Sequence, residues 1–362
     1  MEMLAAIIFV LMYVLIVSEK VHRTIVAMMG AILMIIVGIM PVDTALHHID
    51  FNTLGLLIGM MILVSITAKT GLFDYVAIKT AKAAKAQPRR LLIYLGFITA
   101  LFSAFLDNVT TVLLMVPVTF AITTKLHIPV VPFLLTQILA SNVGGTATLI
   151  GDPPNIMIGS AVKELTFVAF IENLTHSFTH IESSVVALFG AFLLLLLAGG
   201  SQHDVDFSMR KVEWATIFFF IGLFVAVGGL SETGVIRDLA TGAVALTEGD
   251  VTKTSLLVLW LSALVSSVLD NIPFVATMIP LIQNMGAMGV DNLEPVWWSL
   301  SLGACLGGNG TLVGASANLI VAGMAADRGV KISFMNYFKI SFPIMIMTIA
   351  ISTVYVYLRY LL

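Results

Sequence analysis

The stretch SAFLDNVTTVLLMVP at residues 103–117 recurs, with substitutions, as SSVLDNIPFVATMIP at residues 266–280. This interval of 163 residues holds without a gap from Thr53 to Asn155, so both stretches belong to one long internal repeat. The identities thin out in apolar sequence and cluster on Gly, Pro, Asp and Asn. Membrane helices carry such residues where they are interrupted, and a duplicated interruption points to the binding site of a secondary transporter.

The composition is that of a membrane protein. Hydrophobic residues make up 59% of the 362 residues and charged residues only 11%. Runs such as Met3–Ser18 and Thr24–Met40 approach the ~20 apolar residues that cross a bilayer. The first run has no basic residue before it and no small-residue cleavage site after it, so we expect a retained helix, not a signal peptide. We predict a multi-pass protein of the inner (plasma) membrane, in contact with the lipid bilayer and not with nucleic acid.

Several chemistries find no support in the sequence. Cys305 is the only cysteine, which excludes an internal disulfide and a metal site built from several thiolates. No GxxxxGK[ST] phosphate-binding loop is present. We therefore predict a transporter and not an enzyme, with no metal and no cofactor. The energy would come from an H⁺ or Na⁺ gradient, or from an ATPase subunit docked on the basic segment Lys69–Arg90.

The predicted fold is an all-α polytopic membrane protein with two inverted repeats. Each repeat should contain a re-entrant hairpin, because each hairpin arm spans only ~24 Å at 1.5 Å per residue. Each should also contain an unwound (broken) transmembrane helix. The boundaries are residues 1–175 for the first repeat, with its hairpin at about 91–124 and its broken helix at about 130–162, and residues 176–362 for the second, with its hairpin at about 255–285 and its broken helix at about 295–325.

The loop charges orient this arrangement. Lys69–Arg90 carries six Lys/Arg and one Asp, which predicts a cytoplasmic position. Three membrane crossings between Thr24 and Ser184 then give the second repeat the opposite orientation in the membrane. The repeat is nevertheless incomplete, because the helices expected at Leu4–Val17 and Ile340–Leu358 have no counterpart in the other half. We interpret this as the loss of two helices and their loop near Thr175.

Asp107 and Asp270, which the repeat pairs, stand at the two hairpin tips within apolar sequence. An ionisable group at membrane depth costs at least ~2.5–3.5 kcal/mol on insertion scales. An Asp-Asn pair can simply cap the helix that follows, but a cap does not need a charge at both tips. We therefore assign both residues to proton or ion coupling. Asp152 before Pro153 is either a local helix cap, the reading we favour, or a third acid on the proton path.

The second signal is a pair of glycine-rich interruptions that begin at Gly144 and Gly307. Irregular backbone is tolerated at membrane depth only where it lines a cavity or is buried in protein. A packing kink is the simpler reading, but two matched breaks with hydroxyl and amide side chains favour a binding site. The expected substrate-binding residues are Asn108, Thr110, Gly144, Gly145, Thr146, Thr148, Asn155, Asn271, Gly307, Gly308, Asn309, Thr311 and Asn318.

The motif at residues 103–112, together with GGTATLIGDPPN at residues 144–155, resembles the ion transporter superfamily. The greatest likeness is to the branch of arsenite efflux permeases, sodium/proton antiporters and melanosomal P-protein-like permeases, and it covers nearly the whole chain. The resemblance implies two re-entrant hairpins, two unwound helices, a scaffold domain, a homodimer and elevator-type movement of a transport domain.

The tips discriminate among cargos. The resembling symporters of this superfamily that carry divalent anions have Ser-Asn-Thr at their hairpin tips. This chain has Asp107-Asn108 and Asp270-Asn271 in those places. Two carboxylates repel an anion, and the sequence indicates no Arg or Lys near either tip to offset them. Di- or tricarboxylate symport therefore ranks low.

Two readings remain, and we favour the first. In it, neutral arsenous acid or its antimony analogue binds to hydroxyls and amides and leaves the cytoplasm in exchange for protons carried by the two tip acids. The single Cys305 excludes capture by three thiolates. In the second reading the tip acids hold Na⁺ directly, and the protein is a sodium/proton antiporter. The paired ionisable tips argue against a channel or scaffold without coupled transport.

Overall fold

The computed structural model describes residues 1–18, 20–85, 87–162, 182–198 and 201–362, and within these ranges the regular structure is helical throughout. The all-α fold predicted from the sequence is confirmed. The helices are α1 (Glu2–Ser18), α2 (Arg23–Ile36), α3 (Val42–His47), α4 (Phe51–Lys69), α5 (Leu72–Ala83), α6 (Pro88–Phe105), α7 (Asn108–Leu126), α8 (Val131–Thr146), α9 (Pro153–Ala161), α11 (Ser183–Leu197), α12 (Gln202–Lys211), α13 (Trp214–Glu232), α14 (Val235–Thr247), α15 (Val251–Ser266), α16 (Asn271–Ala287), α17 (Glu294–Gly307), α18 (Ser316–Ala326), α19 (Phe334–Val356) and the terminal π-helical turn η1 (Tyr357–Leu361).

The long helices are apolar enough for a membrane. Among the described residues, α4, α6, α7, α13 and the α19–η1 helix have the length and hydropathy to cross a bilayer. Large apolar side chains also remain exposed along the outer helices, for example Phe97 and Phe189 at 67% and 68%. Lipid, which is as apolar as these side chains, suits such a surface. The chain is an all-α polytopic membrane protein.

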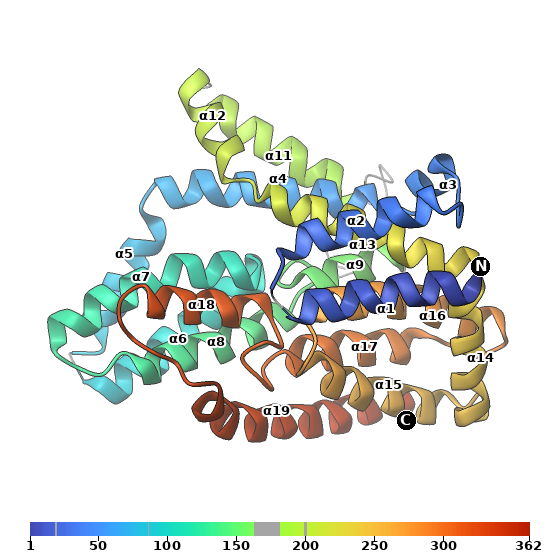
Figure 1. Cartoon of the computed structure of the whole chain (residues 1–362). Helices are drawn as coiled ribbons and strands as arrows, with labels where there is room; N and C mark the ends of the chain where they lie inside the picture. Colours follow the sequence, from blue (N-terminus) through green and yellow to red (C-terminus); the bar gives the residue numbers. More distant parts are fainter. Residues whose placement is uncertain (19, 86, 163–181, 199–200) are drawn as a thin grey trace, which may run out of the picture.

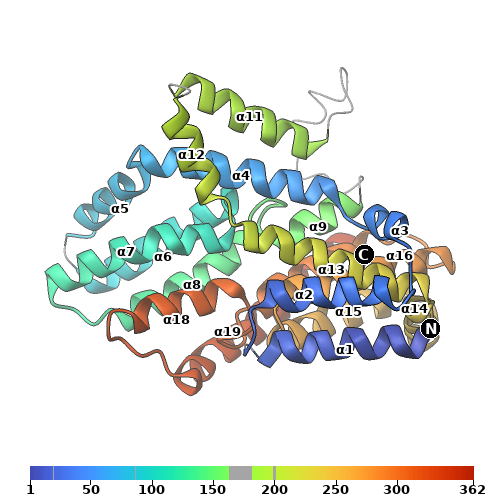
Figure 2. The same ribbon diagram turned by 45° about the horizontal axis from the view of Figure 1, so that its top comes forward.

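The helices pack in pairs. The closest pairs are α4 with α11, α13 with α2, α6 with α8, and α15 with α17. Figure 1 shows α2, α4, α11 and α13 together along its upper side, and α6, α8, α15, α17 and α19 along its lower side. The view in Figure 2 shows α11 and α12 projecting from the α4 side, with α5 at one end of the molecule and α14 near the other.

Paired glycines allow matching helix contacts in the two halves. A Cβ atom on Gly59 would lie 2.8 Å from the carbonyl carbon of Ala187, so α4 and α11 touch backbone to backbone. A Cβ atom on Gly222 would lie 2.6 Å from the carbonyl carbon of Ala27, which brings α13 equally close to α2. Small residues permit such close approach of membrane helices. The repeated sequence therefore produces a repeated contact.

The two interrupted helices and the two hairpins occupy the stretches that the repeat pairs. α8 stops at Thr146 and α9 begins at Pro153, while α17 stops at Gly307 and α18 begins at Ser316. Each hairpin consists of two long helices joined by a very short tip, α6 to α7 at Leu106-Asp107 and α15 to α16 across residues 267–270.

Replacing Gly222 by leucine should separate α13 from α2 and lower the melting temperature of the protein in detergent. Overpacking of this kind typically costs ~1–3 kcal/mol. Gly190→Leu is the matched control, because no described atom outside its own helix lies within 4 Å of a Cβ built there. Equal melting temperatures for the two variants would contradict the close α2–α13 contact.

Candidate functional site

The two hairpin tips are held by helix capping. Asp107 is the N-cap of α7, and its carboxylate accepts hydrogen bonds from the Thr110 amide at 2.8 Å and from the Thr110 hydroxyl. Asp270 is the N-cap of α16 and accepts from the Ile272 amide at 3.2 Å. Each tip acid therefore stabilises the first turn of its own helix. Capping leaves further lone pairs on each carboxylate for other partners.

The tips meet at a small, largely enclosed cavity. Its volume of about 20 Å³ leaves room for about one water molecule, since a water needs ~10–15 Å³. Eight of the thirteen lining residues are polar or charged, and the lining comes from α2, α4, α7, α9, α13, α16 and α18. The lining residues are Arg23, Leu57, Met61, Asp107, Asn108, Val109, Asp152, Pro153, Glu213, Thr216, Asn271, Ile272 and Ser316.

A cation lies at the second tip, so the expectation that no Arg or Lys approaches either tip is wrong. The Arg23 guanidinium nitrogen Nη1 lies 3.1 Å from the Asp270 carboxylate and 2.5 Å from the Ser316 hydroxyl. Ser316 itself donates to Asp270 at 2.6 Å. Basic residues ahead of an apolar run are typical of cytoplasmic loops, so the sequence pattern gives no sign that Arg23 reaches a tip. The start of α2 instead lies beside the tip.

Asp152 does not act as the helix cap that we favoured from the sequence. It occupies the N-cap position of α9, but its side chain makes no capping hydrogen bond. Pro153 and Pro154 begin that helix without amide hydrogens, so little is left for a cap to satisfy. The Asp152 carboxylate, 1% exposed, instead accepts from the Asn271 amide at 3.3 and 3.4 Å. An acid of the first repeat thus contacts the tip of the second.

Buried amides link the first tip to the second interruption. Asn108 donates to the Asn142 side-chain oxygen at 3.1 Å. Asn142 donates in turn to the side-chain oxygens of Asn309 and Asn318 at 3.0 and 2.9 Å. The Asn309 amide nitrogen is buried and has no hydrogen-bond partner within the described part of the chain. These side-chain amides therefore connect the first hairpin tip and α8 to the interruption between α17 and α18.

Two paired asparagines close the interruptions. Each uses its side-chain amide to bond two carbonyls that the broken helix leaves free. The bonds run from Asn155 to Gly145 and Thr148 and from Asn318 to Gly308 and Thr311, over 2.8–3.3 Å. These asparagines therefore shape the irregular backbone and do not line the cavity.

The predicted substrate-binding residues separate into three groups. Asn108 and Asn271 line the cavity, and Thr110 lies at the first tip against Asp107. Asn309 lies in the amide chain. The others build the interruptions. The Thr148 and Thr311 hydroxyls donate to the carbonyls of Ala104 and Ser267, and the Thr146 hydroxyl donates to the Asn142 carbonyl. Four glycines lie so close to neighbouring atoms that a larger side chain would be crowded there: Gly144, Gly145, Gly307 and Gly308.

Several cavity residues were missed by the sequence reasoning. They are Arg23, Glu213, Thr216 and Ser316, together with Asn142 of the amide chain. Glu213 had a usable signal, because the repeat pairs it with Asp50 and each acid stands three residues before a paired threonine. Thr216 donates to Glu213 at 3.0 Å, as Thr53 donates to Asp50 at 2.5 Å. Within the described ranges, no three His, Cys, Asp or Glu side chains are grouped to hold a metal ion.

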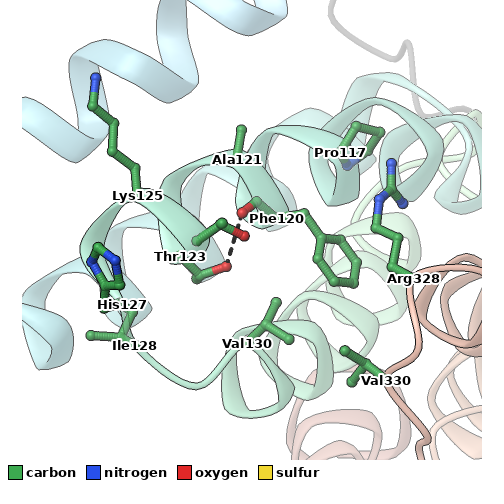
Figure 3. A pocket seen from close by; sticks show the side chains of 11 residues that line it. Pro117, Phe120, Ala121, Thr123, Lys125, His127, Ile128, Val130, Arg328 and Val330 are labelled. Carbon is green, nitrogen blue, oxygen red and sulfur yellow. Dashed lines mark hydrogen bonds between the residues drawn. The ribbon is translucent and has the colours of Figure 1, made fainter.

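A second, larger cleft lies apart from these residues (Figure 3). It occupies about 680 Å³ between the end of α7, the following loop and the segment after α18. The Arg328 guanidinium stacks over the Phe120 ring at 4.6 Å, and Lys125 points away from the cleft. None of the predicted site residues lines it, so we place the functional site at the smaller central cavity.

The fold and this site define a class of protein. Two hairpin tips and two interrupted helices that meet at one cavity lined by carboxylates and amides within a membrane bundle are the parts of a secondary transporter. The chain belongs to the citrate transporter family, whose sequence profile matches residues 13–303. The resemblance to the ion transporter superfamily is thereby confirmed.

Relatives agree with this assignment. The chain is 37% identical to an uncharacterized transporter of Mycobacterium bovis over 430 positions, which cover 99% of each chain. It is 35% identical over 432 positions to a protein of Mycobacterium leprae named 46 kDa membrane protein, covering 100% of this chain and 99% of that protein. The P protein of Sus scrofa is 30% identical over 97% of this chain, which spans 59% of the P protein.

The first of these alignments is longer than the chain itself. It extends over 430 positions against 362 residues, so at least 68 positions of the relative have no counterpart here. The point near Thr175 at which we expected a segment to be missing falls within residues 163–181, which lie outside the described ranges.

The Arg23–Asp270 pair should behave as a coupled unit. Arg23→Gln leaves the Asp270 carboxylate without its cation and should lower the melting temperature, whereas adding Asp270→Asn removes the uncompensated charge and should restore part of the loss. Residues in contact show interaction energies of ~0.5–3 kcal/mol. The pair is only 29% and 16% exposed.

The matched control is the more exposed pair of Lys69 and Asp204, whose side chains are 48% and 24% exposed. Surface pairs contribute at most ~1 kcal/mol, so Lys69→Gln should change the melting temperature little. Strictly additive effects of Arg23→Gln and Asp270→Asn would rule out the coupling.

Proposed function

We propose that the protein is a proton-coupled secondary transporter that exports arsenous acid, or its antimony analogue, from the cytoplasm. The single observation that carries this proposal is the charge of the central cavity. Asp107, Asp152 and Glu213 line it, and Asp270 joins it through Ser316, whereas Arg23 is the one guanidinium or ammonium among the lining residues. With every group ionised the cavity is strongly negative, which opposes the entry of an anion.

The same groups are hydrogen-bond acceptors. An ionised carboxylate can only accept, and the amide oxygens of Asn108 and Asn271 accept as well. Arsenous acid is uncharged near neutral pH and offers three hydroxyl donors. Cargo with several donors and no charge therefore complements a cavity with several acceptors and an excess of negative charge.

Carboxylates also supply the coupling. A proton that binds to Asp107 or Asp152 removes one negative charge and converts one acceptor oxygen into a donor. Cargo and proton then compete for the same oxygens, which is the requirement for exchange. At the second tip, protonation of Asp270 removes the ion pair with Arg23 and frees the guanidinium.

Sodium/proton exchange is the second candidate, and the size of the cavity favours it. Its volume of about 20 Å³ suits a small ion, and carboxylate oxygens are ligands that hard cations prefer. Citrate, which gives the family its description, is a third cargo to be tested. Its counter-ion in this cavity would be Arg23, but this arginine is already paired with Asp270.

We also propose that the protein lies in the inner (plasma) membrane as a homodimer that works by an elevator-type movement. Two inverted repeats with re-entrant hairpins provide the moving and static parts in this proposal. The basic segment Lys69–Arg90 is the surface at which an ATPase subunit would dock.

The first test uses the full chain in liposomes with an imposed pH gradient. Internal pH is followed while arsenite, sodium or citrate is added separately, with protein-free liposomes as the control. Proton movement that requires arsenite is expected. Movement that requires sodium alone would replace the first proposal by cation exchange, and movement that requires citrate would show that the negative cavity does not exclude carboxylates.

The acids can be tested one at a time. Asp107→Asn, Asp152→Asn and Asp270→Asn should each reduce the initial rate of pH-driven flux at least about tenfold, equivalent to ~1.4 kcal/mol, because an amide carries no titratable proton. The exposed Asp43→Asn in α3 is the control and should leave the flux unchanged. Full pH-driven flux in all three cavity variants would remove protons on these carboxylates from the mechanism.

A further inference from the structure

The last long helix covers the second interruption. The Tyr337 hydroxyl of α19 donates to the Asn309 carbonyl at 3.2 Å, and the Ser341 hydroxyl donates to the Gly310 carbonyl at 3.2 Å. Met345, one turn further on, lies against Gly310, where an added Cβ would be 3.1 Å from its methyl group. Residues four apart lie on one face of a helix. One face of α19 therefore satisfies and shields backbone that α17 leaves free.

Among the described residues, nothing covers the first interruption in this way. The carbonyls of Thr146 and Ala147 correspond to those of Asn309 and Gly310, but no donor among the described residues reaches them. Ala147 is exposed where Gly310 is buried. One turn earlier, Val143 is 41% exposed, whereas its partner Leu306 is 6% exposed. The same irregular backbone is thus shielded in one repeat and open in the other.

A second difference lies at α11. α1 packs on α2 at Gly30, where an added Cβ would lie 2.8 Å from the Met12 sulfur. Ala27 of α2 faces Gly222 as Ala187 of α11 faces Gly59. These matching contacts pair α2 with α11 at an interval of 160 residues, which pairs Gly30 with Gly190. No described atom outside its own helix lies within 4 Å of a Cβ on Gly190, and the neighbouring Phe189 is 68% exposed. The counterpart of α1 is therefore absent from the described part of the chain.

Lipid does not suit the open side of the first interruption. Carbonyls outside a regular helix are tolerated at membrane depth only when protein or water satisfies them. A lipid chain has no hydrogen-bond donor to offer Thr146 and Ala147. An apolar helix face such as that of α11 can rest against lipid, but a broken backbone cannot.

We propose that a two-helix membrane segment from outside this chain covers the first repeat at both places. One helix, the counterpart of α19, carries two hydroxyl donors four residues apart and bonds the carbonyls of Thr146 and Ala147. The other, the counterpart of α1, lays an apolar face on α11 at Gly190. The relatives indicate its source, since the Mycobacterium bovis transporter exceeds this chain by at least 68 aligned positions (430 against 362), and two helices of ~20 residues with a loop fit within that length.

The test measures whether a cysteine beside each interruption is accessible to a reagent. Val143→Cys and Leu306→Cys, each combined with Cys305→Ala, are reacted with a lipid-soluble maleimide in membranes. The residues of the Mycobacterium bovis relative that have no counterpart in this chain are then supplied as a separate polypeptide and, in a second protein, fused into the chain at Thr175. In the chain alone, Val143→Cys should react and Leu306→Cys should not. With the segment present, reaction at Val143→Cys should be lost.

The fused protein keeps the test decisive even if the separate polypeptide does not insert. A segment whose hydroxyl residues are replaced by alanine or phenylalanine should protect Val143→Cys less well, because the carbonyls lose their donors. Continued reaction of Val143→Cys in the fused protein would overturn the proposal. Protection in the chain alone would also overturn it, since this chain or a second copy of it would then provide the cover. The readout does not involve transport, so it is independent of the cargo.

Discussion

Four helices begin at the central cavity, and the need to satisfy their first turns organises the site. α7, α9, α16 and α18 start at Asn108, Pro153, Asn271 and Ser316, and all four of these residues line the cavity. The first amide groups of a helix lack internal partners, and helix N-termini carry partial positive charge. Acceptors must therefore gather where these helices meet. Asp107 and Asp270 meet this requirement as N-caps, which is how carboxylates are stabilised in apolar surroundings.

The convergence also explains why the capping and transport readings of the tip acids do not exclude each other. A carboxylate oxygen that bonds an amide of its own helix still leaves its second oxygen free for another partner. At Asp270 one oxygen faces the Ile272 amide while the other takes Arg23 and Ser316. The cap fixes the position of the acid, and the remaining lone pairs give it chemistry.

Much of this arrangement could be predicted from the sequence because it follows local rules. The repeat of Gly, Asp and Asn located both tips and both interruptions, since helix breaks and caps depend on residues adjacent in the chain. Arg23 and Asn142 could not be found this way. Their partners lie 247 and up to 176 residues away, and only the packing of α2 and α8 brings them together. Asp152 looked like a cap because its neighbours are prolines, yet those same prolines leave only the Asn155 amide for a cap to bond, and that amide bonds the Asp152 carbonyl.

The departures from the repeat have a further consequence. Asp152 has Ala315 as its counterpart, Ser316 has Pro153, and Asn142 has Cys305. The first repeat therefore contributes a second acid, while the second repeat contributes the hydroxyl that joins Arg23 at Asp270. Arg23 forms its ion pair with Asp270, so the duplicated acids have unequal surroundings. Asp270 is paired, whereas Asp107 shares a cavity with Asp152 and Glu213 that has no second guanidinium or ammonium among its lining residues. The two tips therefore differ in charge, although they descend from the same segment.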